Sequence, residues 1–145
     1  LFPYRDRYAY HGLASGDIGF SIPASVWISL AQPGRRVVTI VGDGSAMYSI
    51  QALWTAAHLK LPITYVICNN GGYLIIKQRL LAFHGNRNFN GMEIRNPEID
   101  YAAMAGSMGV TAERITRPED FGPAMTRALR HDGPVVLDVV VDGRV

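Results

Sequence analysis

A single carboxylate, Asp43, stands between two glycines in the segment GDGSAM, which spans residues 42–47. No further Asp or Glu follows until Glu93, whereas the intervening segment contains two adjacent amides in CNNGG at 68–72. One carboxylate, one amide oxygen and one backbone carbonyl suit Mg²⁺ when phosphate oxygens complete its octahedral shell. A second acid at the same place would repel the phosphates. These residues therefore predict a site for Mg²⁺ and a diphosphate.

Backbone groups of the first motif can also contribute to such a site. Where a glycine-rich loop opens into a helix after Ser45, its N–H groups favour an anion. Other phosphate motifs fit less well, because G-x-x-x-x-G-K-[ST] does not occur and GDGSAM lacks the third glycine of a dinucleotide site. Each motif alone is also a common turn. Two such motifs, each directly after a strand-like run, favour a shared ligand.

The two motifs follow apolar runs that are rich in β-branched residues, VVTIV at 37–41 and ITYVIC at 63–68. Such runs predict strands that are buried on both faces of a parallel sheet. A helix should connect them, because one apolar helix face is formed by the spacing of Ile50, Leu53, Trp54 and Ala57. Ligands of open parallel sheets bind at the carboxyl ends of the strands, so both motifs should meet at one edge.

Further elements extend this pattern along the chain. Helices are predicted within 19–34, where the helix ends before Pro33, within 99–109 and within 117–133, and strands at 110–115 and 134–142. Strands that alternate with helices predict an α/β fold with an open parallel sheet and helices on both faces. Residues 83–97 are rich in Asn and Gly, which predicts a mobile loop near the site.

Composition limits the possible functions. At 145 residues and 48% hydrophobic, the chain is predicted to form one domain over 1–145 with a sizeable core. The 14 basic and 12 acidic residues are dispersed, and no apolar run reaches the roughly 20 residues of a membrane span, so neither nucleic acid nor membrane is expected as a partner. The single Cys68 is predicted to be buried, which favours a cytoplasmic setting.

A longer comparison of motifs points to a known family. The stretch from GDGSAM to CNN resembles the thiamine diphosphate signature, in which GDG is followed at a characteristic distance by NN, and here 24 residues separate Gly44 from Asn69. The segments SGDIGFSIPASVWISLAQPG, NPEIDYAAMAGSMGV and GPVVLDVVV look like the pyrophosphate-binding domain of the 2-oxo acid decarboxylase and acetolactate synthase group. GDGSAMYSIQALWTAA is especially similar to benzoylformate decarboxylases.

This resemblance implies thiamine diphosphate and Mg²⁺ as cofactors. It makes Asp43 and Asn70 side-chain ligands of the metal, with the backbone oxygen of Gly72 as a third ligand. It assigns the diphosphate to the amides of Gly44 and Ser45.

The resemblance also implies contacts to the rest of the cofactor. The carbonyl of Gly16 would meet the aminopyrimidine, and Ile18 would support the bent shape of the cofactor. Gly42 and Tyr73 are placed with these residues as cofactor-binding. The bound cofactor would be the electron sink when a 2-oxo acid loses CO₂ or is ligated to a second carbonyl compound.

Other parts of the family's site lie outside these 145 residues. The activating Glu belongs to a pyrimidine-binding domain, so no catalytic residue is assigned in this chain. The first residues include no initiator Met and no signal-peptide pattern. We therefore expect a fragment of a longer protein or one of two subunits, inactive by itself, whose site forms between domains of a homodimer or homotetramer.

Departures from the family pattern leave the substrate open. SGDIG stands at 15–19 where SGGLG is more usual, which adds the carboxylate of Asp17, and GGYLIIKQ follows NN where benzoylformate decarboxylases have GTYGALRW. An acetolactate synthase-like carboligase and a non-catalytic domain kept for assembly remain alternatives. Lys77 and Arg79 are interpreted as a solvated helix face, with contact to a substrate carboxylate as the second possibility.

Overall fold

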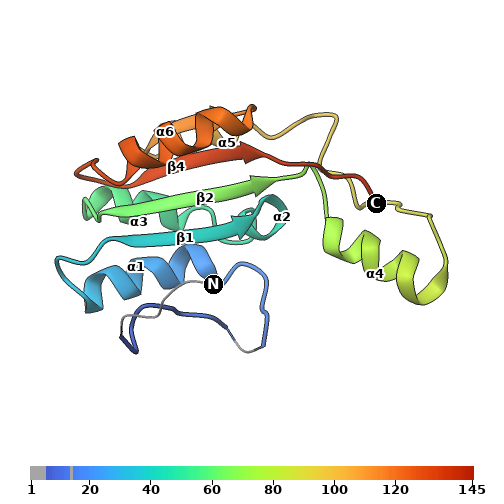
Figure 1. Cartoon of the computed structure of the whole chain (residues 1–145), viewed down its shortest axis with the longest axis horizontal. Helices are drawn as coiled ribbons and strands as arrows, with labels where there is room; N and C mark the ends of the chain where they lie inside the picture. Colours follow the sequence, from blue (N-terminus) through green and yellow to red (C-terminus); the bar gives the residue numbers. More distant parts are fainter. Residues whose placement is uncertain (1–5, 14) are drawn as a thin grey trace.

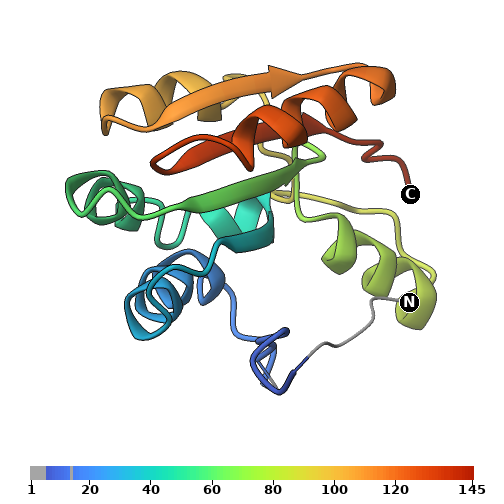
Figure 2. The same ribbon diagram turned by 60° about the vertical axis from the view of Figure 1, so that its left-hand side comes forward.

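Four parallel strands form one sheet in the order β1-β2-β4-β3 in the computed structural model, which describes residues 6–13 and 15–145. The strands are β1 (Val37–Gly42), β2 (Ile63–Asn69), β3 (Thr111–Ile115) and β4 (Val135–Val140). Figure 2 shows them side by side. Each of the four predicted strands forms, with ends at most two residues from those expected.

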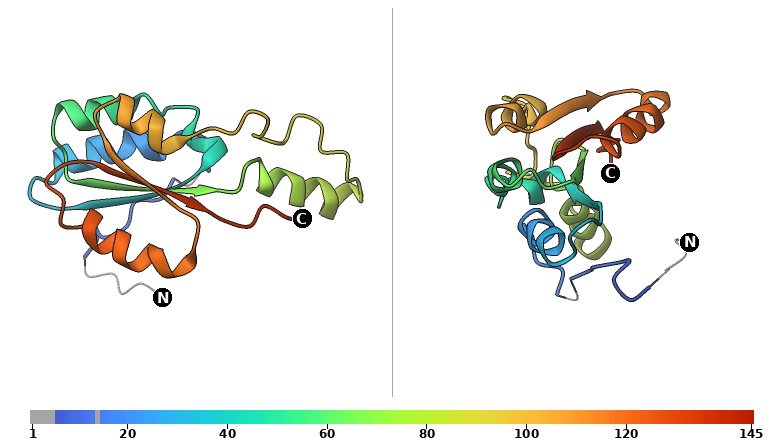
Figure 3. Two further views of the ribbon diagram at one scale, coloured as in Figure 1. Left: turned by 90° about the horizontal axis from the view of Figure 1, so that it is seen from above. Right: turned by 90° about the vertical axis from the view of Figure 1, so that its left-hand side faces the viewer.

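Helices cover both faces of the sheet. The helices of the described residues are α1 (Ser21–Ala31), α2 (Asp43–Ala46), α3 (Ala52–His58), α4 (Leu74–His84), α5 (Tyr101–Ser107) and α6 (Pro118–Ala128). In Figure 3, α1, α3 and α5 lie on one face and α6 on the other. The predicted α/β fold with an open parallel sheet is therefore confirmed. None of the helices in the described part of the chain is both long and apolar enough to cross a membrane.

Two clusters of apolar side chains form the core, one on each side of the sheet. The larger cluster lies under α1, α3 and α5 and includes Leu53, Ile63 and Ile67, all fully buried. The smaller cluster lies under α6 and includes Val66 and Leu137. Because β2 contributes to both clusters, the prediction of a strand buried on both faces is correct for β2. Cys68 near its end is half-buried.

The same prediction is wrong for β1. Val38 and Ile40 are 44% and 66% exposed, whereas Thr39 and Val41, which alternate with them, are buried. The reason is the position of β1 at the edge of the sheet, where α1 covers one face, while α6 packs on β3 and β4 rather than on β1.

The helix between the two motifs also differs from the prediction. It begins only at Ala52, because residues 47–51 form turns, so Ile50 is buried but does not belong to the helix. Leu53 and Ala56 form the buried face. Trp54 is 56% exposed and stacks on the ring of His58 at 5.0 Å between centroids.

Helix ends follow local sequence rules. The carboxylate of Asp100 accepts a hydrogen bond from the backbone N of Ala103 at 2.8 Å and so caps α5. Pro118 occupies the first turn of α6 together with Glu119 and Asp120. The negative charges of these two acids interact favourably with the positive end of the helix dipole. α4 lies beyond the carboxyl ends of the strands, on the same side as the C-terminus (Figure 1).

We expect the two adjacent residues of α3 to differ sharply in their contribution to stability. Leu53→Ala should lower the free energy of unfolding by about 2–5 kcal/mol, because it leaves a cavity in the core. Trp54→Ala should cost less than about 1 kcal/mol, since that side chain is mainly in solvent. Urea denaturation followed by circular dichroism measures both, and equal losses would contradict this assignment of the buried face.

Candidate functional site

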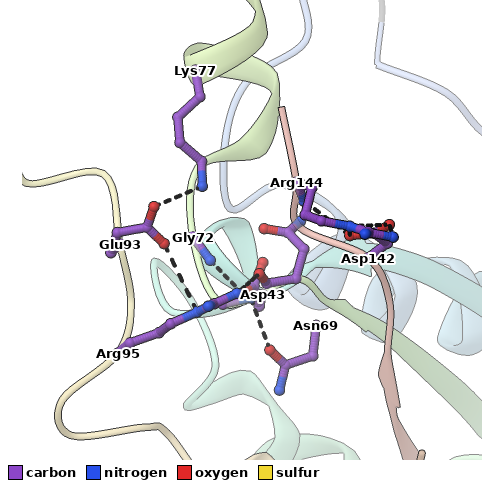
Figure 4. A network of polar contacts seen from close by, with 10 residues as sticks. Asp43, Asn69, Gly72, Lys77, Glu93, Arg95, Asp142 and Arg144 are labelled. Atoms are coloured by element: carbon purple, nitrogen blue, oxygen red, sulfur yellow. Dashed lines mark hydrogen bonds and ion pairs between the residues drawn. The ribbon is translucent and has the colours of Figure 1, made fainter. Parts of the chain in front are cut away.

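The two glycine-rich motifs meet through the side chain of Asp43. This residue follows β1 directly and is only 1% exposed. Its Oδ2 accepts hydrogen bonds from the backbone N of Gly71 at 2.8 Å and from that of Gly72 at 3.1 Å. The backbone oxygen of Asp43 accepts a third bond from the hydroxyl of Tyr101 at 3.1 Å. The predicted convergence of GDGSAM and NNGG at one edge of the sheet is therefore confirmed (Figure 4).

Two glycines of these motifs are required by close contacts. A Cβ on Gly44 would lie 2.6 Å from the ring of Tyr73, so only glycine lets the first motif pack against the second. Gly71 has φ +68°, a conformation that residues with a side chain rarely adopt. The structure thus brings together Asp43, Gly44, Gly72 and Tyr73, four of the predicted site residues.

Asn70 provides a test of whether a cation fits here. Its Oδ1 is buried and accepts no hydrogen bond from any described residue. A buried carbonyl oxygen without a partner costs about 1–3 kcal/mol, a cost that a bound cation would remove. The described residues contain no group of three or more His, Cys, Asp and Glu side chains that could hold a metal. The donor set at this edge is instead one carboxylate, one amide and backbone oxygens, which suits Mg²⁺ beside a phosphate.

A third segment is attached to the first motif. The Oγ of Ser45 accepts a hydrogen bond from the backbone N of Gly19 at 2.9 Å, and the Oγ of Ser49 donates to the backbone oxygen of Gly19 at 2.5 Å. These bonds hold residues 15–19 beside α2. Within this segment the apolar side chain of Ile18 is 51% exposed.

The remaining predicted cofactor residues are also at the surface. Gly16 has φ +71° and donates from its backbone N to the oxygen of Leu13 at 3.3 Å, so it bonds within its own loop. Gly42 is exposed at the end of β1. Gly16 lies in the segment 15–19 that is bonded to Ser45, and Gly42 directly precedes Asp43. Their roles in cofactor binding remain predictions.

Sequence reasoning missed Asp138, a fully buried acid in the middle of β4. Its Oδ1 accepts a hydrogen bond from the Nδ2 of Asn69 at 2.9 Å, and the Oδ1 of Asn69 in turn accepts from the backbone N of Gly71 at 3.2 Å. The first Asn of the pair is thus held by the sheet, whereas the buried Oδ1 of the second has no hydrogen-bond partner among the described residues. The sequence signal that could have identified Asp138 is its position as the single acid within the apolar run PVVLDVVV.

The electrostatics of Asp138 are dominated by desolvation. Burial raises the pKa of this carboxyl, and the hydrogen bond from Asn69 together with the charge of Arg114 only partly oppose the rise. The Nε of Arg114 lies 3.7 Å from Oδ2, which has no hydrogen-bond partner among the described residues. Ionised Asp138 is therefore incompletely compensated.

The prediction for Lys77 is wrong. Its side chain is 4% exposed rather than solvated, and its Nζ lies 2.9 Å from the Oε1 of Glu93. The reason is that the segment after α4 turns back along the helix, since Tyr73 N donates to Met92 O at 2.9 Å. Arg79 is exposed, as expected, with its guanidinium 5.8 Å from the ring centroid of Phe83.

Known proteins resemble this chain along most of its length. Residues 2–139 match the family described as thiamine pyrophosphate enzyme, C-terminal TPP binding domain. The chain is 37% identical over 135 residues to benzoylformate decarboxylase of Pseudomonas aeruginosa, covering 93% of this chain and 25% of that protein. It is 33% identical over 127 residues to the large subunit of acetolactate synthase isozyme 2 of Escherichia coli, covering 88% and 23%.

A solved structure gives the same result for the fold. The thiamine diphosphate-dependent 4-hydroxybenzoylformate decarboxylase of Rhodococcus jostii is 37% identical and superposes with a TM-score of 0.79, covering 89% of this chain and 24% of that one. The chain therefore spans about a quarter of the length of the relatives that it matches.

Stability should depend on pH through Asp138. Because its folded pKa is raised, the neutral form favours folding below the unfolded pKa of about 3.9, and this contribution is lost as the pH rises through the folded pKa. The free energy of unfolding of the wild type relative to Asp138→Asn should therefore fall as the pH rises above about 4.

Urea denaturation of both proteins across this pH range measures the difference. Asp132→Asn is the matched control, since the side chain of Asp132 is fully exposed. A difference between wild type and Asp138→Asn that stays constant with pH would contradict the assignment.

Proposed function

We propose that this chain, which belongs to the thiamine pyrophosphate enzyme family through its C-terminal TPP-binding domain, binds the Mg²⁺-diphosphate end of thiamine diphosphate at the site around Asp43. Asp43, Asn70 and the backbone oxygen of Gly72 would hold the metal, and the amides of Gly44 and Ser45 would hold the diphosphate. The observation that carries this proposal is the buried Oδ1 of Asn70, which has no hydrogen-bond partner among the described residues.

The geometry of Asp43 supports the same assignment. Both of its backbone partners, Gly71 and Gly72, donate to Oδ2, and no described residue donates to Oδ1. The carboxylate is thus oriented by one oxygen, and the other oxygen is available to a cation. The same two bonds fix the backbone directly after Asn70 and directly before the Gly72 carbonyl, so they help to align the three proposed ligands.

Thiamine diphosphate supplies an electron sink for the cleavage of 2-oxo acids. The part of this chain is to bind and orient it. Ile18 and the carbonyl of Gly16 lie on the segment that Ser45 and Ser49 attach to the first motif, where they can meet the ring end of the cofactor. The exposed apolar side chain of Ile18 is consistent with a bound ring as its cover.

The whole protein is proposed to be a cytoplasmic enzyme that decarboxylates or carboligates a 2-oxo acid. A pyrimidine-binding domain, from another part of the protein or a separate subunit, would supply the activating Glu, in a homodimer or homotetramer. Similarity to a benzoylformate decarboxylase and to an acetolactate synthase supports either reaction. A non-catalytic role is less favoured, because both proposed side-chain ligands are present.

Binding of thiamine diphosphate should require both Mg²⁺ and Asp43. In calorimetric titrations, Asp43→Ala should weaken binding by more than about tenfold, or about 1.4 kcal/mol. Asp43→Asn keeps an oxygen for the amides of Gly71 and Gly72 but removes the charge, and it should weaken binding as well. Asp132→Ala is the control. Asp132 lies just before the amino end of β4, at the opposite end of the strands, so this variant should bind like the wild type.

If the chain alone is too incomplete to hold the cofactor, the same titrations are made with a pyrimidine-binding domain of the family added. Binding that is independent of Mg²⁺, or that is unchanged in both Asp43 variants, would refute the proposed site.

A further inference from the structure

Glu93 lies between two basic side chains beside the second motif. Its Oε1 is 2.9 Å from the Nζ of Lys77 on α4, and its Oε2 is 3.8 Å from the Nε of Arg95 (Figure 4). Lys77 is almost fully buried, with a side chain that is 4% exposed, whereas the Glu93 side chain is 46% exposed. One carboxylate therefore links the buried face of α4 to the segment that follows it.

Arg95 continues this link to the loop at 69–73, called here the metal-binding loop. Its Nη2 donates a hydrogen bond to the backbone oxygen of Asn70 at 3.2 Å. Its Nε lies 2.6 Å from the position that a Cβ on Gly71 would occupy, so the guanidinium rests directly against the loop backbone. The chain of contacts Lys77, Glu93, Arg95 and Asn70 will be called the ionic clamp.

The backbone beside the clamp is paired as well. Tyr73 N donates to Met92 O at 2.9 Å, and Ile94 N donates to Gly71 O at 2.8 Å. These two bonds flank Gly72 and Glu93, which face each other as an antiparallel bridge. Segment 92–95 thus lies against the metal-binding loop on the side that Asp43 does not hold.

The charge of Glu93 matters because of the burial of Lys77. Removing the acidic partner of a buried cation leaves that charge uncompensated, which is more unfavourable than the absence of both charges. Lys77 also lies 6.0 Å from the ring centroid of Phe89, in the same returning segment. Without Glu93, Lys77 would reach for water, and the contact between α4 and segment 92–95 would loosen.

We propose that Glu93 is a positioning residue that fixes Asn70 and Gly72 for their ligand by closing the ionic clamp over the metal-binding loop. Asp43 holds this loop from the side of β1 through Gly71 N and Gly72 N, and the clamp holds it from the opposite side through Asn70 O. The nature of the ligand, Mg²⁺ with a diphosphate, rests on the proposed function. The positioning of the loop by Glu93 does not.

The test uses Glu93→Gln, which keeps the shape of the side chain and removes its charge. Glu98→Gln is the matched control, because Glu98 lies in the same region, is 66% exposed and pairs with Arg114 instead. Amide hydrogen exchange is followed in the unliganded chain. In Glu93→Gln the amides of residues 71–73 should exchange at least about tenfold faster, while those of β2 and β4 are unchanged. Glu98→Gln should exchange like the wild type.

The second readout is the affinity for Mg²⁺ in the presence of thiamine diphosphate, with the pyrimidine-binding domain where binding needs it. It should fall at least about tenfold in Glu93→Gln, in line with losses from outer-shell substitutions, and not in Glu98→Gln. Unchanged exchange at residues 71–73 would overturn the proposal, and so would faster exchange with wild-type Mg²⁺ affinity. If the wild type binds no Mg²⁺, the proposed function fails, and the exchange data alone decide whether Glu93 positions the loop.

A further variant covers the case in which Glu93→Gln does not fold. Lys77→Met combined with Glu93→Gln removes both charges and leaves no unpaired buried cation, while Arg95 still loses its acidic partner. Residues 71–73 should again exchange faster than in the wild type. Wild-type exchange in this double variant would overturn the proposal.

Discussion

The site depends on one interaction: the carboxylate of Asp43 accepts two hydrogen bonds from backbone N–H groups. Gly71 and Gly72 donate to the same oxygen, at 2.8 and 3.1 Å. Because Asp43 directly follows one strand and the two glycines follow the next, this carboxylate determines the distance between the two loops. It is also nearly inaccessible to water, so the loops meet where electrostatic interactions are strong. Every proposed metal ligand is a partner in these bonds or lies one residue from a partner.

The sheet explains why the two loops can meet at all. β1 and β2 pair in parallel with Gly42 opposite Cys68, so both strands reach the same edge together. β2 lies between β1 and β4 and packs into both core clusters, which fixes its end more firmly than that of an edge strand. Asp138 on β4 then holds the side chain of Asn69. The rigid part of the fold therefore orients the first amide of the pair, and the second is the proposed ligand.

The same edge carries apolar and ionic features that the domain does not use for its own core. Ile18 is exposed beside the first motif, and α4 lies outside the sheet with Lys77 as its only buried residue among those described. The further domain proposed above would cover features of this kind. The ionic clamp shows how a projecting helix can still be connected to the loop that needs to be rigid.

By itself the sequence determined the strands, the two motifs, their meeting at one edge and the family, because strand patterning and turn residues act over a few neighbouring positions. It also gave the candidate set Asp43, Asn70 and Gly72. Only the tertiary structure decided that Lys77 is buried, that Trp54 and Ile40 face solvent, and that Asp138 supports Asn69. The Asn69–Asp138 bond joins residues 69 positions apart and the Lys77–Glu93 pair joins residues 16 apart. The burial of a residue and the identity of its partner depend on which elements pack together, and this is set by the whole chain rather than by local pattern.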